Sequence, residues 1–339
     1  MPQINNFPGG FAAGLTIRGL PIAVTHPGKM FWVSNATTLS DRQIGGSDGN
    51  KGTFDAPMAT IGGALAQCVA NRGDVILVKP GHAETISAAG TVANMAAGTA
   101  INLNKAGVAI VGLGTGTKRP TLTWSAAAST IEVSASNVTL SNFLCISTMA
   151  TGFTTTAFAI LTAVVANDFT LDNCEFRDSS STTGFLGIIT QGGTTSLALD
   201  GLTVNKCKRF SILSTVTNVT AFVVLTGAVT DRMTLTDNFI VQNTAHTAAQ
   251  LASWGANNVT NALIARNITQ SKDTSNAGSL LQFSGTACNG MVMDNRCHHL
   301  VAGGVGLLCP LGSKFGFAQN WCGITGTADK NAAANPLPT

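Results

Sequence analysis

Tyrosine is absent from this 339-residue sequence, and charged side chains are scarce. The 19 Lys plus Arg and 16 Asp plus Glu make up 10% of the chain, against about 25% in an ordinary soluble domain. So few charges exclude a coiled coil and a charge-rich disordered chain. The net charge of +3 is too small to indicate nucleic-acid binding. No apolar run reaches the roughly 18 residues of a membrane span.

Motifs for metals, cofactors and secretion are missing as well. None of the eight cysteines belongs to a CxxC pair, so no zinc site is predicted and buried, reduced thiols are expected. His298 and His299 are adjacent, and neighbouring residues of a strand point to opposite faces, so they predict no metal site. The Gly-rich run at 111–117 is followed by Lys118-Arg-Pro120 rather than a helix, which excludes a dinucleotide fingerprint. The N-terminus lacks the basic and apolar regions of a secretory signal, so we expect synthesis in the cytoplasm.

A repeated phrase is the most informative feature that is present. Alternating apolar residues lead to an Asn and then to another apolar residue, as in residues 138–144. The anchor positions are separated by 31, 33, 32, 29, 28 and 25 residues, and such regular steps indicate internal repeats. The anchors are Asn142, Asn173, Lys206, Asn238, Asn267, Asn295 and Asn320.

Each repeat fits one coil of a parallel β-helix. A strand of period two ends at a turn where Asn tolerates the left-handed conformation, and a second apolar strand follows. Leucine spacing does not fit leucine-rich repeats, and about 30 residues are too few for a propeller blade. Because coils stack about 4.8 Å apart, the Asn anchors are expected to form one ladder of amide hydrogen bonds, broken at Lys206. Cys174 and Cys207 are expected to occupy equivalent places in adjacent coils.

The region before the repeats has a different character. Residues 1–35 are apolar and punctuated by Gly and Pro, which predicts either an attachment arm or an arm folded back as a cap over the first coil. A helix is predicted over 57–70, and a buried strand over 74–81. The side chains expected to bind a partner are Phe7, Phe11, Leu15, Ile17, Arg18, Met30, Phe31 and Trp32.

Residues 44–325 resemble a known family. Gly46-Ser-Asp-Gly-Asn50, Pro57-Met-Ala-Thr-Ile61 and Gly73-Asp-Val-Ile-Leu-Val-Lys-Pro-Gly81 look like the first segment of right-handed parallel β-helix proteins. That family includes the pectate-lyase-like group and many bacteriophage virion proteins. The resemblance implies an all-β, right-handed parallel β-helix of roughly 9–10 coils with a capping helix. The expected divisions are an arm and loop over 1–54, the β-helix over 55–325 and a tail over 326–339.

The functional hypothesis favoured by these features is a structural protein of a bacteriophage virion. The apolar arm, the charge-poor surface and the resemblance together predict a homotrimeric capsid decoration or head-projection protein without enzymatic activity. Its expected partners are its own copies and the major capsid protein or another virion protein, and its expected location is the virion.

Two alternatives stay open. A polysaccharide-degrading enzyme of the tailspike or pectate-lyase type needs two carboxylates about 5–9 Å apart beside a sugar cleft. Its candidate residues are Asp172, Glu175 and Asp237. A non-catalytic adhesin would instead bind a host-surface glycan through exposed Thr and Asn strands.

Overall fold

The structure is a computed structural model that describes most of the chain between residues 28 and 324. The described ranges are 15–17, 20–22, 28–36, 44–91, 99–149, 155–160, 165–179, 184–191, 199–211, 214–225, 230–242, 244–246, 249–255, 258–271, 279–283, 287–299 and 314–324. Of Leu15 and Ile17 only the backbone is described. Phe7, Phe11, Arg18 and the tail 326–339 lie outside the described residues.

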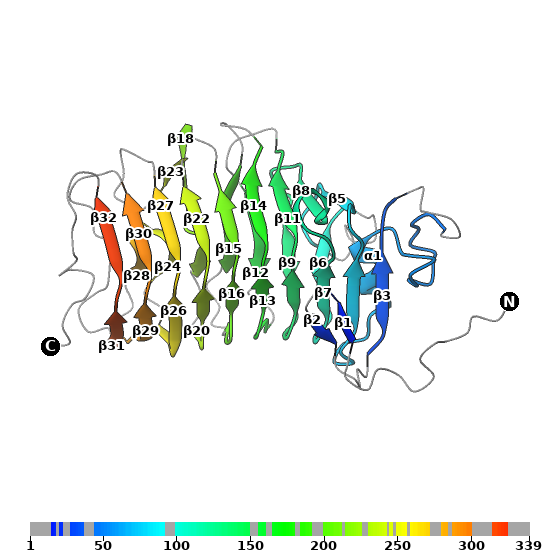
Figure 1. Ribbon diagram of the computed structural model, residues 1–339, viewed down its shortest axis with the longest axis horizontal. Coiled ribbons are helices and arrows are strands. Elements are labelled where there is room, and N and C mark those ends of the chain that lie inside the picture. The colour runs from blue at the N-terminus through cyan, green and yellow to red at the C-terminus, as the bar shows by residue number, and fades with distance from the viewer. Residues whose placement is uncertain are drawn as a thin grey trace.

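Three long parallel sheets, here called sheets 1, 2 and 3, form the molecule (Figure 1). Sheet 1 contains β3 (Met30–Val33), β4 (Val75–Val78), β7 (Ala109–Gly112), β10 (Thr139–Ser141), β13 (Thr170–Asp172), β16 (Thr203–Asn205), β21 (Thr234–Thr236), β26 (Ala262–Ala265), β29 (Asn289–Met293) and β31 (Lys314–Ala318). Sheet 2 contains β5 (Ala83–Ile86), β8 (Thr121–Trp124), β11 (Leu144–Ser147), β14 (Glu175–Asp178), β17 (Lys208–Phe210), β22 (Phe239–Gln242), β27 (Ile268–Ser271), β30 (Arg296–His299) and β32 (Trp321–Ile324). Sheet 3 contains β6 (Ile101–Leu103), β9 (Ile131–Val133), β12 (Thr155–Ile160), β15 (Phe185–Gln191), β19 (Val223–Leu225), β24 (Ala249–Trp254) and β28 (Ser279–Phe283).

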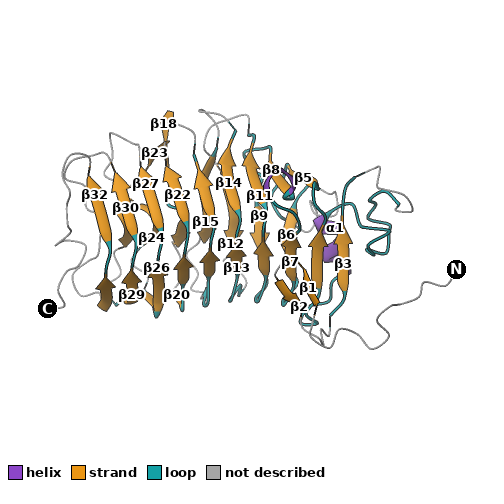
Figure 2. Ribbon diagram, in the orientation of Figure 1, coloured by secondary structure: helices purple, strands orange, loops and turns teal. Residues whose placement is uncertain are grey.

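The chain visits these sheets in turn, which makes the fold a parallel β-solenoid and confirms the predicted fold class. The ten strands of sheet 1 agree with the nine to ten coils expected from the repeats. Figure 2 shows that the described part of the chain is built of strands, with its helical turns towards the N-terminal end. Among the described residues there is no helix long and apolar enough to cross a membrane. The remaining elements are short: the pairs β1 (Leu15–Ile17) with β2 (Leu20–Ile22), β18 (Ser214–Val219) with β23 (Thr244–His246) and β20 (Thr230–Asp231) with β25 (Val259–Thr260), together with α1 (Ile61–Gln67) and the 3₁₀ turn η1 (Gly116–Lys118).

The core lies between the three sheets because alternate residues of their strands turn inward. Trp124 and Phe185 meet edge to face with their ring centres 5.2 Å apart, and Phe158 and Phe176 do so at 6.2 Å. Six cysteines among the described residues are buried, as the sequence predicted. Burial raises the pKa of the Cys174 thiol to about 12. Aromatic rings and thiols thus fill much of the interior.

The first coil begins earlier in the chain than the boundary expected at residue 55. Strand β3 pairs in register with β4, so Met30 to Val33 form the first strand of sheet 1. Helix α1 packs against β3, β4 and β6, and buries Ile61 and Leu65. It is shorter than the predicted 57–70, because the Thr60 side chain caps its start by accepting the Gly63 N–H and the backbone becomes extended at Cys68.

The polar turn between sheets 1 and 2 contains two ladders rather than the single one predicted. Asn142 and Asn173 have positive φ and join through an amide hydrogen bond of 3.1 Å; Lys206 follows at the same left-handed position and ends this ladder. In the next coil that position belongs to Asp237, not Asn238. The second ladder lies one residue later and faces inward. Its members are Asn238, Asn267, Asn295 and Asn320, linked by amide hydrogen bonds of 2.9 Å.

Candidate functional site

The inner ladder determines which side chains begin the strands of sheet 2. Each ladder Asn is buried or half-buried at the turn, so the residue that follows it points outward from the first position of the next strand. These outward residues are Phe239, Ile268, Arg296 and Trp321. They stand in register on β22, β27, β30 and β32 and form a row on the outer face of sheet 2.

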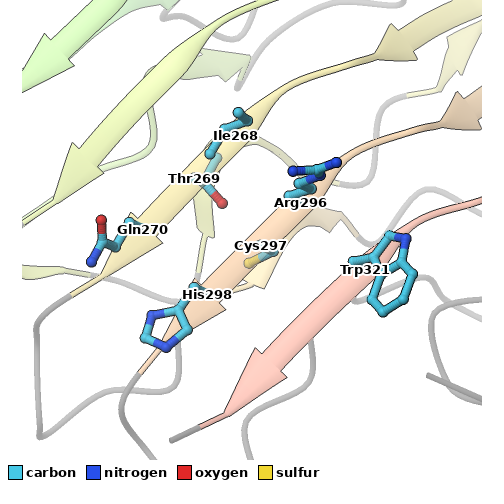
Figure 3. Close-up of a pocket in the computed structure, with 7 residues that line it drawn as sticks. All are labelled: Ile268, Thr269, Gln270, Arg296, Cys297, His298 and Trp321. Atoms are coloured by element: carbon cyan, nitrogen blue, oxygen red, sulfur yellow. The ribbon is translucent and has the colours of Figure 1, made fainter. Parts of the chain in front are cut away.

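A pocket of about 600 Å³ opens on this face near the C-terminal end of the solenoid (Figure 3). Its lining residues are Ile268, Thr269, Gln270, Arg296, Cys297, His298 and Trp321. The Thr269 and Cys297 side chains turn into the core, which leaves the other five to face the solvent. Figure 3 shows these five side chains spread over three adjacent strands.

The chemistry of the pocket combines one flat apolar surface with several polar groups. Trp321 is 59% exposed and is the register partner of Arg296 on the adjacent strand. Gln270 and His298 provide amide and imidazole groups from the neighbouring column. The buried Nδ1 of His298 makes no hydrogen bond within the described chain. No residue of the described lining carries a carboxylate.

The same face continues over the middle coils as an aromatic patch. Phe210 and Phe239 are half-buried, and their ring centres lie 5.7 Å apart. Lys208 precedes Phe239 in the row and is exposed. A second pocket of about 310 Å³ lies over sheet 3, where Val224, Ser253 and Gln282 are outward; the described residues that line it are uncharged.

Glu175, one of the predicted catalytic carboxylates, also lies on this outer face. Its Oε2 contacts Arg119 Nη1 at 3.4 Å, and its Oε1 accepts a 2.6 Å hydrogen bond from Arg177 Nε. The side chain is only 13% exposed. Two arginines therefore neutralise this carboxylate and hold it against the sheet.

Asp172 and Asp237 lie elsewhere and are engaged too. Asp172, on sheet 1, accepts hydrogen bonds from the Ser141 hydroxyl at 3.2 Å and from the Asn205 amide at 2.7 Å. Asp237 forms a two-pronged ion pair with Arg266, whose hydrogen bonds lower the pKa of that carboxyl. The structure gives each of the three predicted carboxylates a structural partner. Within the described chain, no three His, Cys, Asp or Glu side chains gather as metal ligands.

The predicted partner-binding residues that the structure describes differ in exposure. Met30 is 45% exposed on the outer face of sheet 1. Phe31 lies in the core, so it does not offer a surface to a partner. Trp32 is half-buried and meets the Phe54 ring edge to face at 4.9 Å. Because side chains alternate along β3, the segment predicted as one apolar arm has both inward and outward side chains.

The prediction of site residues did not include Ile268, Arg296, His298 and Trp321. A signal for three of them was present: each directly follows an Asn of the repeated phrase. The stacking of coils then brings these positions side by side, although 25 to 28 residues separate them along the chain.

Comparison with known proteins finds similar solved structures of low sequence identity. No family model matches the chain, and no curated protein matches it. Among solved structures, it is similar to a rhamnogalacturonan lyase (15% identity, TM-score 0.45, covering 90% of each chain). It is similar to the pectate lyase Pel9A (15% identity, TM-score 0.46, covering 92% of this chain and 81% of the other). It is also similar to the pectin methylesterase from Aspergillus niger (12% identity, TM-score 0.46, covering 85% and 89%). These structural neighbours are carbohydrate-active enzymes, and none of the three is a virion protein. At these identities and TM-scores the similarities carry no argument about this chain, so its function must be argued from its own residues.

Proposed function

We propose that this protein binds a polysaccharide on the outer face of sheet 2. The observation that carries the proposal is the pocket that the exposed Trp321 ring lines together with Arg296, His298 and Gln270. A sugar ring has an apolar C–H face and a rim of hydroxyl groups. An exposed indole matches the face, and the surrounding donors and acceptors match the rim.

The rigidity of the solenoid favours such a role. The pocket is built on the strands of one sheet, and inner ladder hydrogen bonds hold the turn before each of them. Side chains on strands are positioned more firmly than side chains on loops, so little ordering is needed when a ligand binds.

Binding without cleavage is the form of this proposal that the carboxylates support. Glycoside hydrolysis needs one carboxyl group free to donate a proton and a second to act as base or nucleophile. Glu175 and Asp237 are each paired with arginine, and Asp172 is hydrogen-bonded within sheet 1. The proposal therefore follows the non-catalytic adhesin alternative.

The test measures polysaccharide binding and product release together. Affinity electrophoresis over immobilised polysaccharides compares the wild type with Trp321→Ala and with Met291→Ala. Met291 is a matched control because it is 45% exposed on sheet 1 in a neighbouring coil. If a sugar covers half of the exposed indole, roughly 75 Å² at about 25 cal/mol/Å², the loss is about 2 kcal/mol, or about 25-fold in affinity.

The expected result is binding that weakens in Trp321→Ala alone, without release of new reducing ends. Equal binding by all three proteins would refute the proposed site. Release of oligosaccharides by the wild type would replace binding with catalysis as the function.

A second candidate function is assembly into a bacteriophage virion, as a homotrimeric decoration protein bound to the major capsid protein. The observation that favours it is the group of apolar side chains exposed at the first coil: Met30 (45%), Ile44 (62%) and Phe54 (50%). Deletion of residues 1–35 would then abolish incorporation into particles, and Met30→Ser with Phe54→Ser would weaken it. Normal incorporation of both variants would exclude this candidate.

A further inference from the structure

Two cations on the outer face of sheet 2 have no ion-pair partner among the described residues. Lys208 and Arg296 are exposed, and neither forms an ion pair with any residue in the described part of the chain. Asp294 lies at the turn two residues before Arg296, and Glu175 is in register with Lys208 on the neighbouring strand. Because Arg119 and Arg177 already pair with Glu175, it does not cancel the charge of Lys208.

The register of sheet 2 fixes the distance between these two cations. Lys208 pairs with Phe239, Phe239 with Ile268, and Ile268 with Arg296. Three strand spacings of about 4.8 Å separate the ends, which gives about 14 Å along the solenoid axis. The two residues between them are apolar, and Trp321 extends the row by one strand.

A ligand that matches this row is linear, anionic at intervals and apolar on one side. A globular partner would not need its contacts in a single row at strand spacing. An acidic polysaccharide meets all three conditions, because its ring faces are apolar and its carboxylate or sulfate groups recur along the chain. Charge complementarity also favours an anion, since the row holds cations without matching acids.

We propose, on the basis of the proposed function, that the bound polysaccharide is acidic and lies along the solenoid axis. One anionic group meets Arg296 in the pocket, and another meets Lys208 about 14 Å away. The sugar rings between them pack on Ile268 and Phe239, and the ring beyond Arg296 stacks on Trp321. The pocket is thus one end of an extended track across sheet 2.

The test compares charge and length of the ligand by calorimetric titration at low salt. The probes are alginate, which is carboxylated, dextran sulfate, neutral dextran and a single-stranded DNA of similar length. Alginate oligomers from one to eight sugars add the length series. The proteins are the wild type, Lys208→Ala, Arg296→Ala, the double variant, and Lys51→Ala as an exposed control from the N-terminal loop.

Long acidic chains should bind better than dextran, and affinity should rise with oligomer length until both cations are reached. Each single variant should weaken long chains about two- to fivefold, in line with exposed ion pairs, and the double variant by about the product. Lys208→Ala should leave a single sugar unaffected, whereas Arg296→Ala should weaken it. Lys51→Ala should match the wild type, and salt should reduce the affinity.

Several results would overturn this inference. If the wild type binds alginate and dextran with equal affinity, and Trp321→Ala loses both, the protein binds polysaccharide at the proposed site but does not select acidic chains. DNA binding as tight as that of the acidic polysaccharides would show a general polyanion surface. If Lys208→Ala does not change the affinity for alginate at any oligomer length, the ligand contacts the pocket alone. Failure of every probe to bind would refute the track and the proposed function together.

Discussion

Replacement of Asn267 by alanine tests the physical basis of the solenoid. The Asn267 side chain is fully buried in the inner ladder and makes four hydrogen bonds. Its Oδ1 accepts from the backbone and the amide of Asn238 at 3.1 and 2.9 Å. Its Nδ2 donates to the Leu235 carbonyl at 2.8 Å and to Asn295 Oδ1 at 2.9 Å. Alanine removes all four and leaves the Asn238 N–H without its acceptor.

The magnitude follows from the worth of one buried hydrogen bond. At about 1 kcal/mol net for each bond, the loss amounts to about 4 kcal/mol, a large part of the stability of a typical domain. The matched control is Asn320→Ala at the end of the same ladder. Asn320 makes three such bonds and is half-exposed, so water replaces part of what is lost. We expect about 1–2 kcal/mol there.

Urea unfolding followed by circular dichroism measures both variants. Asn267→Ala should lower the midpoint strongly with an unchanged slope, and Asn320→Ala should lower it much less. A loss below about 1 kcal/mol for Asn267→Ala, or equal losses for the two, would refute the argument that the buried ladder holds the coils in register.

Two further predictions concern acid stability and thiol chemistry. Burial raises the pKa of Asp74, but hydrogen bonds from Arg72 and from two backbone N–H groups outweigh it and leave the pKa at about 2, below the ordinary 3.8. Because this pKa is lowered in the folded state, the ionised carboxylate stabilises the fold above pH 4, and this stabilisation is lost as the pH falls towards 2. The difference in unfolding free energy between the wild type and Asp74→Asn should therefore shrink by about 2 kcal/mol between pH 4 and pH 2. A difference that stays constant over this range would contradict the assignment. Burial likewise raises the pKa of Cys174 and Cys207, so both thiols should react with an aromatic disulfide reagent at pH 8 only as fast as the protein unfolds; rapid labelling of the native protein would show that they are accessible.

The repeated phrase was sufficient to predict the solenoid, because a coil of fixed length must bring like residues together. From Asn238 onwards, however, the predicted anchors lie one residue after the left-handed turn position that the earlier anchors occupy. Asn suits both a left-handed turn position and an inward amide ladder, so alignment on Asn alone cannot distinguish the two. Alignment on the preceding strand does: Leu171 pairs through Val204 with Leu235, and this places Asp237 at the left-handed position.

The candidate site could be predicted only in part. Carboxylates are recognisable in a sequence, but whether Glu175 is free or paired depends on Arg119, which lies 56 residues away. Likewise, the pocket exists because three turns of the chain place Ile268, Arg296 and Trp321 side by side. Their exposure follows from strand alternation after the inner ladder, and this required the correct register.

A crystal structure with an acidic oligosaccharide tests the central claim most directly. The account predicts sugar density on the outer face of sheet 2, parallel to the solenoid axis, with one ring stacked on Trp321 and anionic groups at Arg296 and Lys208. Sugar bound over sheet 1 or sheet 3, with an empty surface at Trp321, would contradict it.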